Sequence, residues 1–245
     1  MSIDEFIEAS NKAKSVDELF DIYKKAMYEL GFDRIIFSLM TDHISIDRRA
    51  GHGIMLNYSD DWMKYYVEQN YEALDPVRKY MYIAPGAFTW TSLMQQPVIT
   101  TKQNLFMKEG DEAGLHDGIG IPLRGPRGAI AGVGAASSAG GVALDDRNLL
   151  SRANLLSQQF YTVYLSLEAQ RAAQEGPEDY VYLTDREQEI LQWCAAGKTR
   201  QEISVILGLS GNTTDWHLRN ILRKMGVGNT TLAAFKALHM GLIQV

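Results

Sequence analysis

Residues 181–245 carry four successive sets of helix start and stop signals, and these constrain the fold more than any other feature of the chain. Each predicted helix begins at a Ser, Thr or Asn that can cap its first turn, and three of the helices end at glycine. Glu187 and Glu202 each complete a Thr-x-x-Glu capping box. The predicted caps are Thr184, Thr199, Ser210 and either Asn229 or Thr230, and the stops are Gly197, Gly208 and Gly226.

The second and third of these helices are separated by a short turn containing Gly208, which is the spacing of a helix-turn-helix. One face of the third helix is expected to pack inward through Thr214, Leu218, Ile221 or Leu222, and Met225. The opposite face carries mostly side chains that can donate to phosphates or base edges: Asn212, Thr213, Asp215, Trp216, Arg219, Asn220 and Arg223. Charge and spacing alone leave two interpretations open, a DNA-binding helix or the solvated helix of a bundle.

Charge is divided unevenly along the chain. The whole sequence has a net charge of -6. Residues 197–245 instead hold six basic residues against Glu202 and Asp215, a net charge of +4. An acidic body with a locally basic end weakly favours an anionic partner for that end only.

Residues 183–236 resemble the DNA-binding domain of LuxR-type transcription regulators. The match rests on Leu183-Thr-x-Arg-Glu187, Glu189, Leu191, Ala196-Gly-Lys-Thr199, Glu202-Ile203, Leu209-Ser210, Thr213, His217, Asn220-Ile221, Lys224 and Ala233. The resemblance implies DNA contacts from Lys198, Arg200, Asn212, Thr213, Trp216, His217, Arg219, Asn220, Arg223 and Lys224. Trp216 departs from the family pattern and indicates either a target-specific contact or packing with another protein. For His217, phosphate donation and packing at the helix start are equally compatible with the sequence.

The N-terminal part mixes helices and strands. Residues 15–30 have a helical period, 32–40 are rich in β-formers, and 118–137 resemble two strands joined by a tight turn at 125–128. A long helical pattern over 144–171 is broken by Gly176-Pro177. We therefore predict an α+β protein. Residues 1–170 are predicted to form an α/β/α sandwich around a sheet with antiparallel pairs. A linker at 171–180 leads to a four-helix domain at 181–245.

An aromatic segment precedes an Asp-Pro pair at 75–76. In a helix over about 60–71, Tyr58 at its entry, Trp62 and Tyr66 share one face. Buried Trp and Tyr tips need acceptors and a buried carboxylate needs donors, so these residues suit a pocket for a small ligand with carbonyl and amide groups. A plain core stripe is equally compatible with the residues alone.

The stretch "YSDDWMKYYVEQNYEALDPV", Trp90 and "GLHDGIGIP" are similar to the autoinducer-binding domain of acyl-homoserine-lactone receptors of the LuxR type. The resemblance implies that Trp62 donates to the lactone carbonyl, Asp75 accepts the ligand amide N–H, and Tyr58 donates to the acyl carbonyl. It places Tyr66 and Trp90 in the pocket wall.

Two pocket positions lack a hydroxyl group. Some relatives have Ser or Thr on the second hairpin strand, where this chain has Gly134, and Val77 after the Asp-Pro also carries no hydroxyl. We expect this end of the pocket to be less polar and roomier, suited to an unsubstituted, branched or aromatic acyl group. Gly118 matches a family glycine and is expected to mark a backbone conformation that requires glycine.

Several other functions are disfavoured by the sequence. The glycine-rich stretches do not form G-x-G-x-x-G at a helix start, and the five His show no catalytic or metal-ligand spacing. Cys194, the single cysteine, supplies no disulfide framework. No apolar run approaches a membrane span of roughly 18 residues, and "MSIDEFIEAS" lacks the features of a signal peptide. We expect no enzyme activity, cofactor, metal or membrane association.

The two resemblances together predict a cytoplasmic, ligand-controlled transcription factor. Its expected partners are DNA, an N-acyl-homoserine lactone, a second copy of the chain and RNA polymerase. A homodimer, paired through the helices near 145–170 and 230–240, would read half-sites roughly 10 base pairs apart. The alternative is an orphan regulator that responds to a non-lactone signal or to none.

Overall fold

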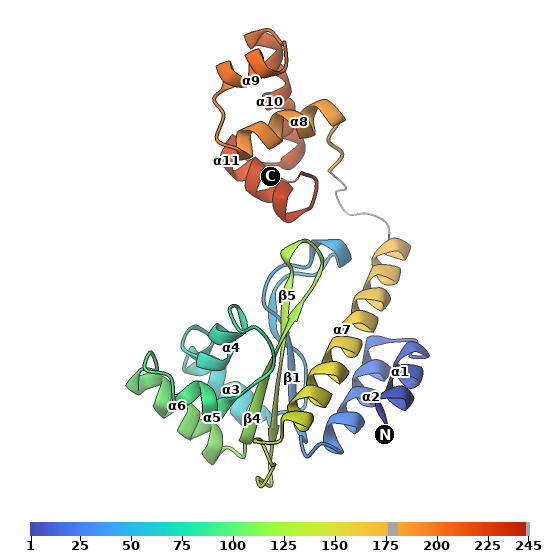
Figure 1. Cartoon of the computed structure of the whole chain (residues 1–245), viewed down its shortest axis with the longest axis vertical. Coiled ribbons are helices and arrows are strands. Elements are labelled where there is room, and N and C mark those ends of the chain that lie inside the picture. Colours follow the sequence, from blue (N-terminus) through green and yellow to red (C-terminus); the bar gives the residue numbers. More distant parts are fainter. Residues whose placement is uncertain (176–180, 244–245) are drawn as a thin grey trace. The chain divides into compact units, whose positions relative to one another are not determined.

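The computed structural model describes residues 1–175 and 181–243 (Figure 1). The chain divides into two compact units, one formed by nearly all of residues 1–175 and the other containing the C-terminal residues. Each unit has its own hydrophobic core.

The first unit is built on a sheet of five antiparallel strands in the order β2-β1-β5-β4-β3. Their bounds are β1 Arg34–Leu39, β2 Gly51–Leu56, β3 Phe88–Thr89, β4 His116–Arg124 and β5 Ile130–Ser137. Because side chains alternate across a strand, Phe37, Ile121 and Val133 point to one face, whereas Ile36 points to the other. The two strands predicted over 118–137 and the strand predicted over 32–40 are confirmed.

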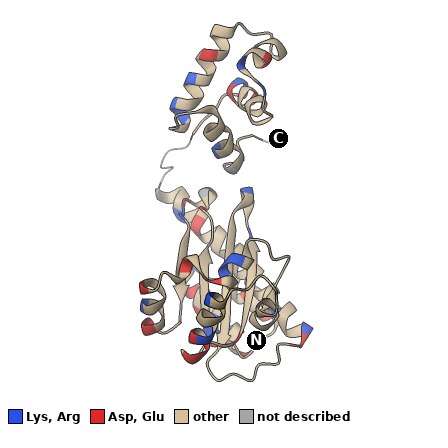
Figure 2. Cartoon of the chain, turned by 90° about the vertical axis from the view of Figure 1, so that its left-hand side faces the viewer, with Lys and Arg blue, Asp and Glu red and all other residues tan. Residues whose placement is uncertain are grey.

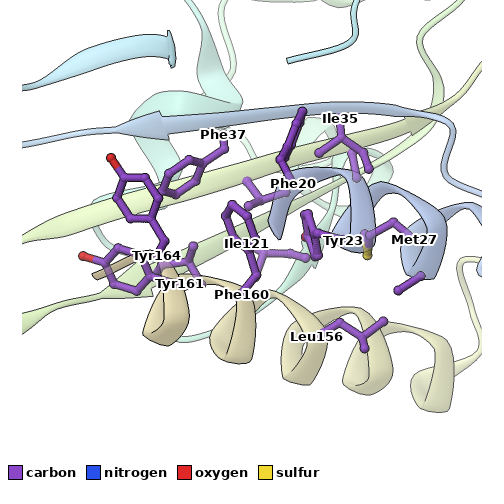
Figure 3. Close-up of a cluster of buried hydrophobic side chains, with 14 of the residues drawn as sticks. Phe20, Tyr23, Met27, Ile35, Phe37, Ile121, Leu156, Phe160, Tyr161 and Tyr164 are labelled. Atoms are coloured by element: carbon purple, nitrogen blue, oxygen red, sulfur yellow. The ribbon is translucent and has the colours of Figure 1, made fainter. Parts of the chain in front are cut away.

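Three helices cover one face of the sheet: α1 Ile3–Asn11, α2 Val16–Tyr28 and α7 Arg147–Glu175. Aromatic rings fill the space between helices and sheet (Figure 3). The rings of Tyr23 and Phe160 stack with centroids 4.5 Å apart, and Phe37 meets Phe160 edge-on at 5.1 Å. The Tyr23 hydroxyl, which would be costly to bury alone, lies 2.6 Å from the Ser157 hydroxyl.

Short helices cover the other face: α3 Asp60–Glu68, α4 Pro76–Met81, α5 Trp90–Met94 and α6 Thr101–Glu112. The predicted α/β/α sandwich is therefore confirmed. The aromatic helix expected over 60–71 is shorter than predicted and ends at Glu68, because Asn70 adopts a left-handed conformation with φ 54°. The chain then makes a 3₁₀ turn at Tyr71–Ala73 before Asp75 begins α4.

The described residues of the second unit form four helices, as predicted: α8 Asp185–Ala195, α9 Arg200–Ile206, α10 Gly211–Met225 and α11 Thr230–His239. Both predicted capping boxes form, at Thr184 and Thr199. Ser210 caps α10, and Asn229, rather than Thr230, caps α11. Helices α9 and α10 form the helix-turn-helix around Gly208, whose φ of 62° is in the left-handed region.

Helix α7 continues to Glu175, five residues into the segment predicted as linker. The predicted break at Gly176-Pro177 lies outside the described residues. Near its end, α7 is tied to the β1–β2 connection through the buried carboxylate of Glu168. Arg48 donates to both carboxylate oxygens, and Arg171 Nε donates to Oε2 at 3.1 Å. Burial opposes ionisation, but these two guanidiniums hold the pKa of Glu168 below its usual value.

We expect Glu168→Ala to lower the free energy of unfolding by about 2 kcal/mol at neutral pH. This is less than for a fully buried pair, because Arg48 is partly exposed. A depressed pKa contributes stability above the pKa of the unfolded chain, and that stability is lost as pH falls through the folded pKa. The free energies of unfolding of the variant and the wild type should therefore become more similar at acidic pH. Thermal unfolding at several pH values measures this.

Glu112→Ala is the matched control, because Glu112 pairs with Lys108 on an exposed helix surface at 3.7 Å. Its loss should change the free energy of unfolding by less than about 0.5 kcal/mol. Equal shifts in the two variants would contradict a stabilising role for the Glu168 cluster.

Candidate ligand pocket and nucleic-acid interface

A cavity lies between the sheet and the short helices α3 to α6. Its volume is about 60 Å³. All seven residues proposed from the sequence line this one cavity: Tyr58, Trp62, Tyr66, Asp75, Val77, Trp90 and Gly134. The cavity is lined mainly by apolar and aromatic side chains, with few polar groups, which is the usual composition of a small-molecule site.

Asp75 is the buried acid of the cavity, with only 8% of its surface exposed. Because Pro76 occupies the first position of α4, the Asp75 side chain caps the helix, and its Oδ1 accepts from the amides of Val77 at 2.8 Å and Arg78 at 3.1 Å. The Tyr66 hydroxyl donates to Oδ2 at 3.1 Å. Burial raises the pKa of Asp75 despite these donors. A carboxylate has about four acceptor sites, so Oδ2 can accept one further N–H.

Aromatic rings form the wall beside Asp75. Trp62 and Tyr66 lie on one face of α3, as the helical register predicts, with ring centroids 6.4 Å apart. Phe106 of α6 packs against both rings, at 6.0 Å and 5.9 Å. Tyr71 is buried against this group but does not line the cavity, and Tyr65 is partly exposed. The three residues that the helical register placed on one face, Tyr58, Trp62 and Tyr66, all line the cavity.

Trp90 closes another part of the wall and explains Gly118. A Cβ atom at position 118 would lie 2.0 Å from Cδ2 of Trp90, so the indole ring can pack only against a residue without a side chain. Gly118 is not among the glycines with positive φ, and the expectation of a special backbone conformation there was wrong. The Trp90 Nε1 donor is buried and has no acceptor among the described residues.

Contrary to the expectation from the sequence, Gly134 does not enlarge the cavity. A Cβ atom there would lie 2.9 Å from Cγ2 of Ile36 and 3.3 Å from the hydroxyl of Tyr58, so neighbouring side chains already fill that space. Burial raises the pKa of Tyr58 well above its usual value, and the nearby charge of Asp75 raises it further. Tyr58 is therefore a neutral hydroxyl at the cavity wall.

Eleven further residues line the cavity and were not predicted from the sequence. Met40 directly follows β1, and the others come from β1, β2, β5, α3, α4 and α6, whose approach depends on the tertiary fold. The eleven residues are Ile36, Ser38, Met40, His52, Met63, Arg78, Met81, Phe106, Met107, Gly110 and Gly132. The period-two alternation was a usable signal, because Ile36 and Ser38 share one face of β1 and Met40 continues the alternation just after the strand ends.

On α10 the predicted inward face is confirmed. Thr214, Leu218, Ile221 and Met225 are buried. Of the residues predicted to contact DNA, Asn212, Trp216, Arg219 and Arg223 are exposed, whereas Thr213, His217 and Asn220 are half-buried. Trp216 is 54% exposed and its ring meets that of His217 at 4.9 Å. The His217 Nδ1 atom is buried without a partner among the described residues.

Several of the basic residues of this unit (Figure 2) are held in ion pairs within it. Arg200 Nε lies 2.7 Å from Asp215 Oδ1, and Lys198 Nζ lies 3.6 Å from Glu202. The Lys224 ammonium lies 2.7 Å from the buried Glu187 carboxylate. Burial of Glu187 opposes ionisation, but the pair with Lys224 holds its pKa below the usual value.

Two guanidiniums of α10 remain without a carboxylate partner among the described residues. Within residues 1–175 and 181–243, Arg219 makes no ion pair, and Arg223 donates only to the amide oxygen of Asn220, at 3.2 Å. These residues lie one helical turn apart on the exposed face, which is the spacing expected from the sequence. The face therefore presents two positive charges beside an exposed indole ring.

In residues 1–175 and 181–243, no group of three or more His, Cys, Asp and Glu side chains is arranged to hold a metal ion. Within the same residues, no helix combines the length and apolar character that crossing a bilayer requires.

Residues 15–163 match the family described as "Autoinducer binding domain", and residues 181–237 match "Bacterial regulatory proteins, luxR family". The quorum sensing-dependent transcriptional regulator RpaR of Rhodopseudomonas palustris is 35% identical over 185 residues, which are 76% of this chain and 72% of that protein. The transcriptional activator AnoR of Acinetobacter nosocomialis is 29% identical over 244 residues, 98% of each chain. Escherichia coli SdiA has a similar fold, with TM-score 0.76 and 22% identity over 99% of this chain and 98% of its own.

Proposed function

Because this chain belongs to the LuxR family of quorum-sensing transcription regulators, with an autoinducer-binding domain and a helix-turn-helix, we propose that its ligand is an N-acyl-homoserine lactone. The buried Asp75 carboxylate carries this proposal. It is a strong acceptor with one site open, in a cavity where Trp90 Nε1 is a donor with no acceptor in the described part of the chain. An acylated amide supplies both the N–H and the carbonyl groups that such a cavity needs.

In this proposal Asp75 accepts the ligand amide N–H, while Trp62 and Tyr58 donate to the lactone and acyl carbonyls. Tyr66 holds the Asp75 carboxylate in place through its 3.1 Å hydrogen bond and, with Trp90, encloses the ligand. Val77 and Gly134 contribute apolar surface. Ligand burial adds contacts that only the folded state can make, so the ligand should stabilise the first unit.

The direct test is mass spectrometry of the full chain produced with and without a panel of lactones. Retention of one intact lactone, with a higher thermal midpoint than the ligand-free protein, supports the proposal. Retention of a non-lactone molecule, or of none, instead supports an orphan regulator with the same fold.

We further propose that the chain acts in the cytoplasm as a homodimer on two-fold symmetric DNA. One α10 helix contacts too few bases to define a specific site. In a dimer, two α10 helices contact two half-sites and so read more bases. Apolar side chains are exposed on both helices expected to pair, Leu155 on α7 and Leu232 and Leu238 on α11. RNA polymerase is the proposed partner at the promoter. Arg219 and Arg223 supply base or phosphate contacts, while Lys198, Arg200 and Lys224 would have to share their charges with internal carboxylates.

Arg219→Ala should weaken specific DNA binding by about 5- to 150-fold, the range for a lost base or phosphate contact of roughly 1–3 kcal/mol. Fluorescence anisotropy, on a site selected by the wild-type protein from genomic DNA, measures this at several salt concentrations. If Arg219 contacts a phosphate, the salt dependence also becomes less steep. Lys102→Ala, which removes an exposed positive charge from α6, is the control and should change binding less than twofold. An Arg219 variant that binds like this control would exclude α10 as the reading helix.

A further inference from the structure

The cavity has a second polar region, formed by Ser38 of β1, His52 of β2 and Arg78 of α4. The resemblance to lactone receptors gives none of the three a role. The Arg78 side chain is only 12% exposed, although it carries a full charge. A guanidinium held in a mainly apolar wall is costly to desolvate, so its contacts indicate what the wall can recognise.

The contacts of His52 fix its tautomer. Arg78 Nη1 lies 3.3 Å from His52 Nδ1, and a guanidinium can only donate, so Nδ1 is the acceptor. The Ser38 hydroxyl lies 3.2 Å from the same nitrogen, and its oxygen already accepts from the Gly53 amide at 2.9 Å. The neutral imidazole therefore carries its proton on Nε2. Burial and the Arg78 charge lower the pKa of His52 to about 4, so the ring stays neutral at physiological pH.

The donors that remain belong to His52 and Arg78, which we call the donor pair. The His52 Nε2–H has no acceptor among the described residues. Arg78 uses Nη2 in an ion pair with Glu72 at 2.7 Å and directs Nη1 towards His52 Nδ1 and Met40 Sδ. The donor pair thus offers N–H groups and no free lone pair, and it can satisfy only an acceptor.

Local charge determines which acceptor fits. Glu72 neutralises the charge of Arg78, and the Asp75 carboxyl group lies three residues before Arg78 at the start of the same helix. The region has no positive charge in excess, so a carboxylate or phosphate on the ligand would be repelled. A neutral oxygen, such as a carbonyl or hydroxyl, pays no such penalty.

Tyr66 places this region close to Asp75. Its hydroxyl donates to Asp75, and its ring stacks on the His52 ring with centroids 4.7 Å apart at 17°. The amide-binding carboxylate and the donor pair are therefore separated by one tyrosine side chain. An oxygen bound by the donor pair belongs to the part of the acyl chain next to the amide.

We propose that His52 and Arg78 recognise a neutral oxygen carried by the ligand's acyl chain near its amide, and so select a β-keto or β-hydroxy acyl group over an unsubstituted one. The inference rests on the proposed function, since it assumes a lactone in this cavity. It departs from the expectation drawn from Val77 and Gly134, because the polar groups come from β1, β2 and α4 instead.

The test uses the full chain and matched sets of lactones with unsubstituted, β-keto and β-hydroxy acyl groups at short, medium and long lengths. Isothermal titration should show at least about tenfold tighter binding of one oxygen-bearing lactone than of its unsubstituted partner, as for a hydrogen bond to a charged or buried donor. Arg78→Met and His52→Phe, which keeps the ring stacked on Tyr66, should each reduce this ratio at least fivefold. Lys79→Met removes an exposed charge from the same helix and should leave the ratio intact.

The outcomes separate the inference from the function on which it rests. A wild-type protein that binds lactones with no preference for the oxygen, or a preference that survives both cavity substitutions, overturns the role of the donor pair alone. A protein that binds no lactone overturns the proposed function as well. If Arg78→Met does not fold, the wild-type ratio and the His52→Phe variant still decide the question.

Discussion

Asp75→Asn should reduce lactone affinity and the transcriptional response by more than about tenfold while leaving the fold intact. Asparagine is isosteric and remains a good N-cap, so its amide oxygen can still accept from the first amides of α4. What it loses is the anionic acceptor, and hydrogen bonds to charged groups are worth roughly 1.5–3 kcal/mol. Titration of the ligand and a promoter–reporter dose response measure the loss.

Asp75→Ala separates the two roles of the residue. Alanine removes both the ligand acceptor and the helix cap. This variant should therefore lose lactone affinity as Asp75→Asn does, and its free energy of unfolding should also fall by about 1 kcal/mol. Asp61→Asn makes the same chemical change at an exposed position beside Trp62 and should respond as wild type does. A wild-type dose response from Asp75→Asn would remove Asp75 from the binding site.

The raised pKa of Asp75 gives the site a pH dependence. Burial shifts the pKa upward, so Asp75 becomes protonated at a higher pH than an exposed aspartate does. A protonated carboxyl is a weaker acceptor for the ligand amide. Lactone affinity should therefore fall as pH is lowered towards that pKa, and Asp75→Asn should lack this part of the dependence.

The features that the sequence predicted correctly depend on neighbouring residues. A capping box spans four positions, so Thr184 and Thr199 revealed two helix starts without tertiary information. The shared face of Trp62 and Tyr66 follows from the helical repeat alone, even though α3 is shorter than expected. Asp75 was recognisable because the following proline fixes its local geometry.

The features that were missed depend on contacts between distant segments. His52 and Arg78 meet in the cavity wall only because β2 and α4 both border the cavity, and nothing local marks either residue as cavity-facing. In the same way, Lys224 and Glu187, which are 37 positions apart in the sequence, pair across two different helices. The role of Gly118 was misjudged because its requirement arises from the Trp90 ring and not from its own backbone angles.

That contact leads to the second large effect that we expect. Gly118→Ala adds one methyl group that would lie 2.0 Å from Cδ2 of Trp90, far inside van der Waals distance. Either the indole leaves the cavity wall or β4 shifts, and overpacking of this kind costs roughly 1–3 kcal/mol. Because Trp90 lines the cavity, ligand affinity should fall by about tenfold or more, and the Trp90 fluorescence environment should change.

Gly110→Ala is the matched control, because it places the same methyl group at another cavity-lining glycine. There the nearest atom, Cζ2 of Trp62, is 3.6 Å away, which is ordinary contact. Gly110 lies within α6, where alanine is favoured over glycine by roughly 0.5–1 kcal/mol, so this variant should be as stable as wild type or more so. Both methyl groups would face an indole ring, but the nearest ring atom is 3.6 Å away at position 110 and 2.0 Å away at position 118. If both variants bind lactone equally well, the packing of Trp90 on Gly118 does not shape the site.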